Sequence, residues 1–202
     1  MSYYPWVNDA EDESFAWLDS HRKEELDENG YLLTEGVSCR DWFPEGLVFD
    51  LSKEDGSKLT DSIPNTSALL VVSEKLKGIL ERETTRGTIE FLSVRLRTPR
   101  KKVLAAPYFI ANVLSTVACM DAKKSDFTMD SIIKDQVHRF RRLVLQEKKI
   151  PKDTKVFRLA EQAQLILVRE DLGQTILDED CTGMFFQDLD DYGSEFRKRV
   201  GS

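Results

Sequence analysis

Hydrophobic and polar positions follow one long pattern that occurs twice in this chain. Residues 69–92 read LLVVSEKLKGILERETTRGTIEFL, and residues 165–188, which lie 96 positions later without a gap, read LILVREDLGQTILDEDCTGMFFQD. Each copy has an apolar run, a charged stretch whose apolar residues have helical spacing, a glycine and a strand-like run. The pattern therefore predicts two similar strand–helix–strand units. Identical matched residues are Leu69 and Leu165, Val72 and Val168, Glu74 and Glu170, Leu76 and Leu172, Glu83 and Glu179, and Gly87 and Gly183.

The first copy also predicts the limits of its helix and of the strands that follow. Ser73 occupies the N-cap position, and the helix is expected to end near Glu83. Thr88–Leu96 then has the composition of a long strand, and Tyr108–Val117 that of a strand pairing antiparallel with it. The residues expected to form the buried face of the helix are Leu76, Ile79 and Leu80.

Outside the repeat the patterns are shorter. We expect Tyr3–Val7 to form an edge strand, because Pro5 lacks the N–H that a central strand uses. Residues 128–137 fit either a short helix or an irregular connection. The other expected elements are a charged helix at 12–28 that buries Phe15, Leu18 and Leu26, strands at Tyr31–Thr34 and Leu47–Leu51, and a strand pair formed by Phe140–Leu145 and Lys155–Leu159.

These elements together predict an α+β protein with a mostly antiparallel or mixed sheet, flanking helices and the two similar strand–helix–strand units. A chain of 202 residues with 41% hydrophobic content is large enough for one substantial core. We expect a single domain in which an acidic N-terminal part, residues 1–60, packs on the main domain, residues 61–202.

One arginine lies inside an otherwise apolar strand. Strand alternation predicts that Phe157 and Leu159 face away from Arg158. If Arg158 is buried, its guanidinium needs a carboxylate or a carbonyl as partner. A plain surface arginine fits the same pattern equally well.

The net charge of −7 is unevenly distributed. Residues 1–60 contain 15 acidic and 5 basic side chains, and residues 170–196 contain nine carboxylates with neither Lys nor Arg. Aromatic residues interleaved with those nine carboxylates suit a docking surface for a basic protein. The alternative is a solvated tail, with docking on the acidic N-terminal helix. The candidate partner-binding residues are Asp178, Glu179, Asp180, Phe185, Phe186, Asp188, Asp190, Asp191, Tyr192 and Glu195.

Side chains that carry catalysis are scarce. The two histidines, His21 and His138, have no metal-ligating or nucleophilic partner at a useful spacing, and no glycine-rich phosphate loop occurs. The basic run at 137–142, VHRFRR, fits the exposed face of a strand better than a nucleic-acid contact in a chain this acidic. We therefore expect no catalytic residues, no cofactor and no metal, and a protein that is not an enzyme.

The same composition predicts a location. The three cysteines are far apart and odd in number, which fits a reducing cytoplasm better than a disulfide framework. The N-terminal residues lack the pattern of a secretory signal, and no stretch has the length of a membrane span. We expect a cytoplasmic protein without membrane contact.

Several segments resemble one known family in their order and spacing. They are LLVVSEKLKGILE, GTIEFLSVRL, YFIANVLSTVACMDAKKSDF, LVLQEKKIPKDTKVFRLAEQAQLILVREDL and GMFFQDL. They are similar to the immunity proteins of bacterial polymorphic toxin systems, specifically the myxobacterial-type immunity domain, over about residues 45–190. The second copy of the repeat differs from the first in having Arg169 where Ser73 stands.

The resemblance implies an antitoxin that acts in interbacterial competition. Such a protein stays in the cytoplasm of the producing cell and binds a cognate toxin domain delivered by contact-dependent or type VI secretion. It implies stoichiometric occlusion of that toxin, which is expected to be basic and possibly a nuclease. Two other interpretations stay open: a small hydrolase or damage-reversing enzyme, which needs a pocket with convergent carboxylates and His21 or His138, and a regulatory subunit of a larger complex.

Overall fold

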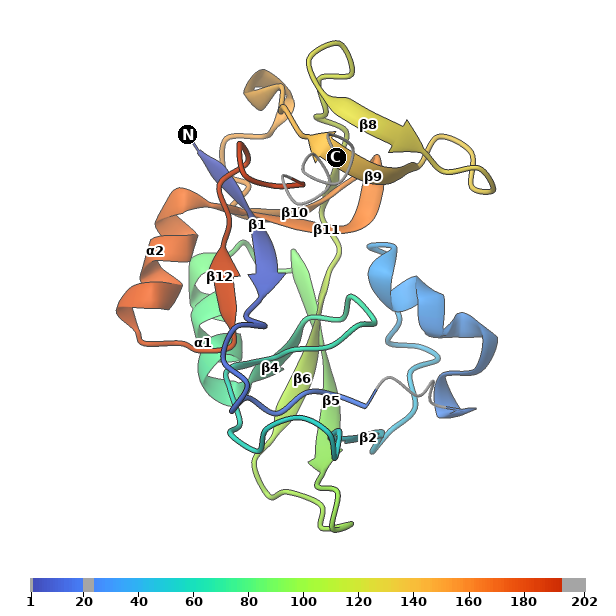
Figure 1. Ribbon diagram of the computed structural model, residues 1–202, viewed down its shortest axis with the longest axis vertical. Helices are drawn as coiled ribbons and strands as arrows, with labels where there is room; N and C mark the ends of the chain where they lie inside the picture. Colours follow the sequence, from blue (N-terminus) through green and yellow to red (C-terminus); the bar gives the residue numbers. More distant parts are fainter. Residues whose placement is uncertain (1, 20–23, 194–202) are drawn as a thin grey trace, which may run out of the picture.

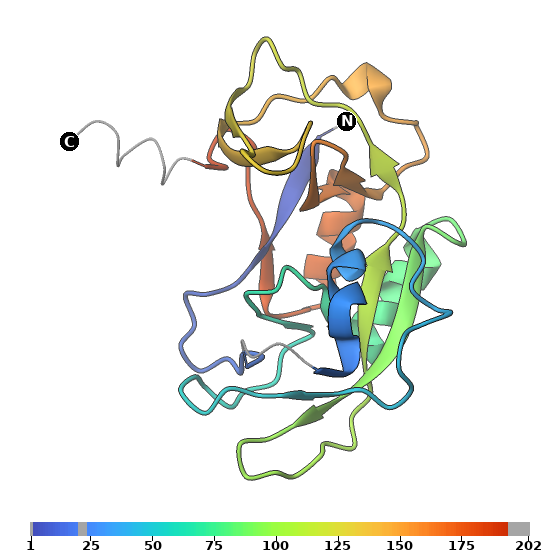
Figure 2. The ribbon, with the colours of Figure 1, turned by 90° about the vertical axis from the view of Figure 1, so that its right-hand side faces the viewer.

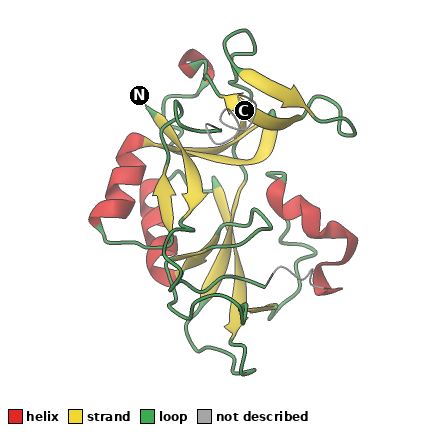
Figure 3. Cartoon of the chain, in the orientation of Figure 1, coloured by secondary structure: helices red, strands yellow, loops and turns green. Residues whose placement is uncertain are grey.

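Two five-stranded sheets and two α-helices organise the computed structural model, which describes residues 2–19 and 24–193 (Figure 1). One sheet has the strand order β12-β1-β11-β10-β7 and the other β2-β5-β6-β4-β3, while β8 and β9 form a separate hairpin. Most neighbouring strands are antiparallel, whereas β10 with β7 and β2 with β5 are parallel. The predicted α+β class with a mostly antiparallel or mixed sheet is confirmed (Figure 3).

The two copies of the repeat form the same split unit. The first consists of β4 (Val71–Ser73), α1 (Glu74–Glu83) and β5 (Ile89–Arg97), and the second of β11 (Gln162–Arg169), α2 (Glu170–Asp178) and β12 (Met184–Phe186). In each unit the two strands run parallel with a third, antiparallel strand between them. That middle strand is β6 (Tyr108–Val113) in the first unit and β1 (Tyr3–Asn8) in the second. The predicted strand–helix–strand units are confirmed.

The two units begin and end their helices in related ways. Ser73 caps α1, because its hydroxyl accepts a hydrogen bond from the backbone N–H of Leu76. Arg169 occupies the equivalent position before α2 and provides no cap; its guanidinium instead binds the carboxylate of Asp171 in the first helical turn, at 2.7 and 2.8 Å. Gly87 and Gly183 both have positive φ angles, 88° and 90°, which favour glycine at each return to a strand.

The helices of the two units share a central core. Leu76 and Leu80 of α1 and Leu172 and Ile176 of α2 pack in one cluster with the strand residues that face them. The opposite face of the β5–β6 sheet is covered by the N-terminal part of the chain, including the 3₁₀ helix η1 (Glu24–Thr34), which lies on the far side from α1 (Figure 2). The opposite face of the β10–β11 sheet is covered by the β8–β9 hairpin and the segment after it. Each sheet therefore packs against other elements on both faces, although Ser93 and Arg95 of β5 are exposed.

The N-terminal strand is central to its sheet, so the prediction of an edge strand is wrong. β1 pairs with β11 on one side and with β12 on the other. Pro5 fits this position because its carbonyl accepts from the backbone N–H of Gln187 just beyond the end of β12, where the ladder stops and no donor is required from Pro5. The boundary between residues 1–60 and 61–202 stays a prediction.

Two other predicted elements of the N-terminal part differ from the structure, and a third is confirmed. Of the helix expected at 12–28, residues 12–19 are not helical, residues 20–23 lie outside the described residues, and residues 24–28 belong to η1. Phe15 and Leu18 are buried and form isolated bridges to Lys58 and Leu51. Residues Tyr31–Thr34 belong to η1 and not to a strand. Both differences have one cause: the apolar spacing of this segment matches contacts with the β5–β6 sheet, not a regular helix face. β2 (Val48–Asp50) lies where the Leu47–Leu51 strand is predicted.

The region from 126 to 159 pairs differently from the prediction. Residues 128–137 belong to a hairpin formed by β8 (Asp126–Met129) and β9 (Val137–Arg142). The expected pairing of Phe140–Leu145 with Lys155–Leu159 is wrong, because β10 (Val156–Leu159) pairs with β11, its immediate successor, and with β7 (Thr116–Val117). Short connections close at a lower entropy cost, which favours the β10–β11 hairpin. The remaining elements are β3 (Ser62–Ile63) and the 3₁₀ turn η2 (Glu147–Lys149).

Arg158 is buried at the junction of both sheets and the N-terminal part. Its side chain is 1% exposed, whereas Phe157 and Leu159 are buried on the other face of β10 in a separate cluster. The guanidinium donates to three carbonyls: that of Val113 at 2.8 Å, that of Ala163 at 2.9 Å and that of Leu33 at 3.0 Å. Burial lowers the pKa of Arg158 to about 10, so the group stays charged at neutral pH. The interpretation of a buried arginine with carbonyl partners is confirmed.

Glu90 is a second buried charge that fastens the same N-terminal segment. Its carboxylate accepts from the hydroxyl of Ser38 at 2.7 Å, the backbone N–H of Cys39 at 2.8 Å and the side-chain amide of Asn112 at 3.3 Å. Burial alone raises the pKa of Glu90, but these hydrogen bonds outweigh it and keep the pKa below its ordinary value. Residues 33–39 are thus tied to both sheets.

We predict that Arg158→Met lowers the free energy of unfolding by at least about 3 kcal/mol, because three buried carbonyls lose their donor at roughly 1–3 kcal/mol each. The matched control is Arg95→Met on β5, where the arginine is exposed and a change below about 0.5 kcal/mol is expected. Urea unfolding of both variants measures the difference. Equal midpoints for the two variants would contradict the structural role given to Arg158.

Candidate functional site

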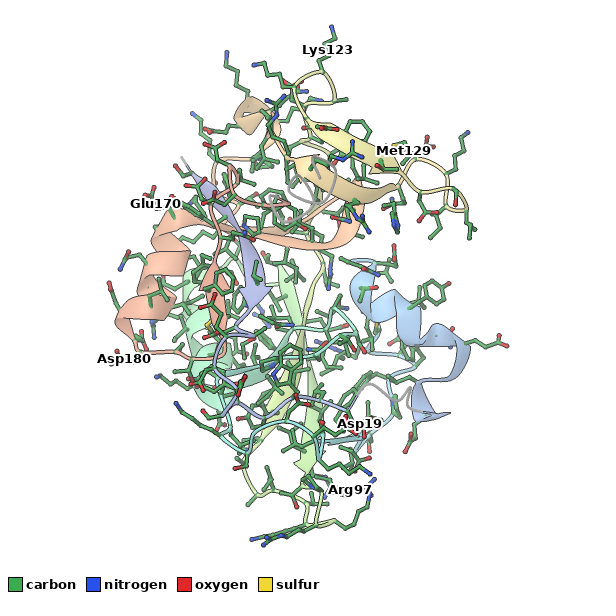
Figure 4. All side chains as sticks on the ribbon, in the orientation of Figure 1. Asp19, Arg97, Lys123, Met129, Glu170 and Asp180 are labelled. Atoms are coloured by element: carbon green, nitrogen blue, oxygen red, sulfur yellow. The ribbon has the colours of Figure 1, made fainter. Side chains whose placement is uncertain are left out.

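The acidic segment predicted to bind a partner is divided by β12 into two patches. Asp178, Glu179 and Asp180 lie at the end of α2, before β12, and residues 188–192 lie after it (Figure 1). Figure 4 labels Asp180 at the lower end of α2, far from the β8–β9 hairpin. Glu195 lies outside the described residues. We name residues 178–180 the helix-end patch and residues 188–191 the acidic turn.

Basic residues from elsewhere in the chain compensate part of this charge. Arg82 of α1 binds Glu179 in the helix-end patch, and Lys75 donates to the carbonyl of Asp180 at 3.3 Å. Asp171, at the start of α2, is held by Arg169 and by Lys155, with 3.4 Å between the Lys155 amine and the carboxylate. The hydrogen bonds from Arg169 are the main reason why the pKa of Asp171 lies well below its usual range. The helix-end patch is therefore partly an internal contact between α1 and α2.

The acidic turn is a compact local structure. The backbone N–H of Asp190 donates to the carboxylate of Asp188 at 3.0 Å, and those of Asp191 and Tyr192 donate to its carbonyl at 3.1 and 3.0 Å. The side chains of Asp188, Asp190 and Asp191 are exposed. The Tyr192 ring packs against Phe140 of β9, with 6.4 Å between ring centroids. The acidic turn thus adjoins the β8–β9 hairpin.

Phe185 and Phe186 point to opposite faces of β12, as strand alternation predicts. Phe186 packs edge-to-face on Trp6, with ring centroids 5.3 Å apart. A side chain at position 173 would crowd this ring, because a Cβ built on Gly173 lies 3.2 Å from Phe186. Phe185 is 40% exposed. One ring therefore completes the core and the other is available to a partner.

The sequence interpretation missed the most exposed apolar group in the described part of the chain. Met129, Ile132 and Ile133 are 47%, 91% and 60% exposed and lie at the end of the β8–β9 hairpin. The signal in the sequence is a pair of isoleucines inside a polar stretch, DSIIKDQ, which lacks the alternation of a buried strand. We name these three residues the hairpin tip.

Within residues 2–19 and 24–193, Glu147, Asp188 and Asp190 border one hollow, which no histidine lines. No three His, Cys, Asp or Glu side chains in those two ranges are arranged to hold a metal ion. Cys39, Cys119 and Cys181 are free and buried, and burial raises the pKa of Cys119 to about 12. His138 lies 3.8 Å from Asp130 on the hairpin, and His21 lies outside the described residues. The cleft between the two units, lined by Trp6, Asn65, Leu69, Gln162 and Leu165 among others, contains neither histidine nor carboxylate.

The acidic turn and the hairpin tip belong to a chain that matches a known family over almost the whole length of the chain. The model of the immunity protein family (Imm11) matches residues 3–191, from β1 to the acidic turn. The chain belongs to this immunity protein family. A comparison of this chain with curated protein sequences found no match. The family match includes the N-terminal residues, in agreement with the central place of β1 in its sheet.

No helix in the described part of this immunity protein has the length and apolar character that crossing a membrane requires.

The two phenylalanines of β12 give a matched pair of substitutions. We predict that Phe186→Ala lowers the free energy of unfolding by about 3 kcal/mol, because it leaves a cavity beside Trp6 and Gly173. Phe185→Ala is expected to change it by less than about 1 kcal/mol, since that ring is already partly in water. Thermal and urea unfolding measure both. The reverse order of stabilities would show that the faces of β12 have been assigned wrongly.

Proposed function

We propose that this immunity protein binds and neutralises a cognate secreted antibacterial toxin by stoichiometric occlusion, without catalysis. The observation that carries the proposal is the family match, which spans both split units, the hairpin and the acidic turn. Occlusion is favoured over a damage-reversing or hydrolytic activity because Phe185 and the hairpin tip are exposed on the surface, and because the hollow bordered by Glu147, Asp188 and Asp190 contains no histidine.

The charge of the protein supports a finer proposal about the toxin. A net charge of −7 and an exposed acidic turn favour a basic partner, and a nuclease is basic because its site holds phosphate. Opposite charges accelerate association, which matters for an inhibitor that must act before damage occurs. We propose delivery of the toxin by contact-dependent or type VI secretion. The proposed location of the immunity protein is the cytoplasm of the producing cell, with which its three free cysteines are compatible.

Titration of toxin activity distinguishes occlusion from catalysis. With the toxin domain encoded beside this gene, we predict that inhibition is complete at an equimolar ratio and that light scattering gives the mass of a one-to-one complex. An enzyme that repairs damage or modifies the toxin would protect at far lower ratios. Failure to bind this toxin at any ratio would contradict the proposed function.

Charge reversal tests which acidic region docks. We predict that Asp190→Lys with Asp191→Lys slows association about tenfold at low salt and weakens its salt dependence, because these carboxylates lie on the proposed interface. Asp188 is kept, since its carboxylate caps the turn. The matched control is Asp41→Lys with Glu45→Lys, the same charge change on exposed residues of the N-terminal part. Rates are measured by stopped flow at two salt concentrations.

The control variant also tests the alternative docking region. If Asp41→Lys with Glu45→Lys slows association while Asp190→Lys with Asp191→Lys does not, the toxin docks on the acidic N-terminal part. If both variants change the association rate equally and only slightly, neither surface steers the toxin electrostatically.

A further inference from the structure

The β8–β9 hairpin is held against the rest of the protein along its β9 arm. Phe127 and Phe140 pack against each other at 6.3 Å between ring centroids, and Phe140 is buried with Val137 in the cluster below the hairpin. The backbone N–H of Val137 donates to the carbonyl of Glu161 at 2.7 Å. The side-chain amide of Gln136 donates to the carbonyl of Ala160 at 3.1 Å. The arms are therefore fixed to the β10–β11 turn, and the tip projects beyond them (Figures 1 and 4).

The turn that carries the tip is also well ordered by its own hydrogen bonds. One carboxylate oxygen of Asp130 accepts from the backbone N–H groups of Ile132 and Ile133, at 2.7 and 2.8 Å. These two hydrogen bonds lower the pKa of Asp130, and the bond from Ile133 has the larger effect. Asp135 closes the turn with a positive φ of 62°. The backbone thus holds both isoleucine side chains toward solvent.

Three exposed apolar side chains lie within residues 129–133, at the end of this hairpin. Single exposed apolar residues are ordinary, but a grouped patch marks an interaction surface. Here the carboxylate of Asp130 fixes the backbone of the turn. Ile132 and Ile133 therefore stay exposed, although burial would favour two isoleucine side chains. A rigid projection of this kind loses little conformational entropy on binding, which makes it suited to enter a partner's pocket.

We infer that the hairpin tip is the apolar anchor by which this protein binds its toxin, inserting Ile132 and Ile133 into an apolar pocket whose rim carries carboxylates. The charge of the hairpin supports that partner chemistry. Residues 122–142 carry six Lys and Arg side chains and three Asp. Asp130 accepts the hydrogen bonds of the turn, Asp126 lies 3.7 Å from Arg141, and Lys124 lies 3.9 Å from Asp121. The rest of the interface described above is acidic, so the contact area contains both signs of charge.

The contact between Tyr192 and Phe140 places the acidic turn beside the arm of the hairpin that carries the tip. A basic region of the toxin faces the acidic turn, and its carboxylate-rimmed pocket receives the tip. Two oppositely charged contacts fix the orientation of the complex, while the buried isoleucines supply most of the affinity. This inference rests on the proposed function, because its occupant is the toxin.

The test compares two double substitutions that remove similar apolar groups. Ile132→Ser with Ile133→Ser is expected to weaken toxin binding at least a hundredfold by calorimetry and to abolish protection of toxin-expressing cells. The control, Val103→Ser with Leu177→Ser, changes side chains that are 39% and 45% exposed elsewhere and is expected to stay within threefold of the parent. Circular dichroism and thermal unfolding verify folding. A second variant, Ile132→Glu, alters only the most exposed side chain and is expected to weaken binding at least tenfold.

The outcomes separate this inference from the proposed function. If the parent binds and the Ile132 and Ile133 variants bind equally well, the anchor is wrong and the function stands. If the parent does not bind the toxin, the function fails and the inference with it. If light scattering shows a parent dimer that the double substitution converts to a monomer, the tip binds a second copy of the chain and the inference is overturned.

Discussion

The buried guanidinium of Arg158 is the interaction on which the arrangement of this protein depends. A charge removed from water must be surrounded by acceptors, and here the acceptors are carbonyls from three separate segments: Leu33 in η1, Val113 in β6 and Ala163 in β11. Satisfying the ion therefore fixes the N-terminal part and both sheets relative to one another in a single step. Glu90 extends this effect to the next residues of the N-terminal segment through Ser38 and Cys39.

The scaffold positions the interface through contacts that are independent of it. The turn between β10 and β11 holds Gln136 and Val137 at the start of the β9 arm, and β9 provides Phe140, against which Tyr192 packs beside the acidic turn. The same sheet buries Phe186 and leaves Phe185 exposed. The proposed interface is thus built on the folded scaffold, and binding there would need little reorganisation of the backbone.

Local patterns predicted the split units because their information is local: the N-cap of Ser73, the helical spacing of Leu76 and Leu80, and Gly87 all lie within a few turns. The central position of β1 was not predictable in this way, since its neighbours lie more than 150 residues later. The ion pair between Arg82 and Glu179 could not be predicted for the same reason, because the two residues are 97 positions apart in the sequence. The hairpin escaped recognition because Ile132 and Ile133 are exposed, contrary to the rule that relates apolar residues to cores.

The use of β1 as the middle strand of the second unit has a consequence for the order of events during synthesis. The first unit draws its middle strand, β6, from residues that follow it directly, so it can close while translation continues. The second unit needs the earliest strand of the chain and one of the last, and β1 has no lasting neighbour until residues 162–186 have left the ribosome. A nascent chain that has not yet reached β11 and β12 therefore presents β1 without the two strands that pair with it.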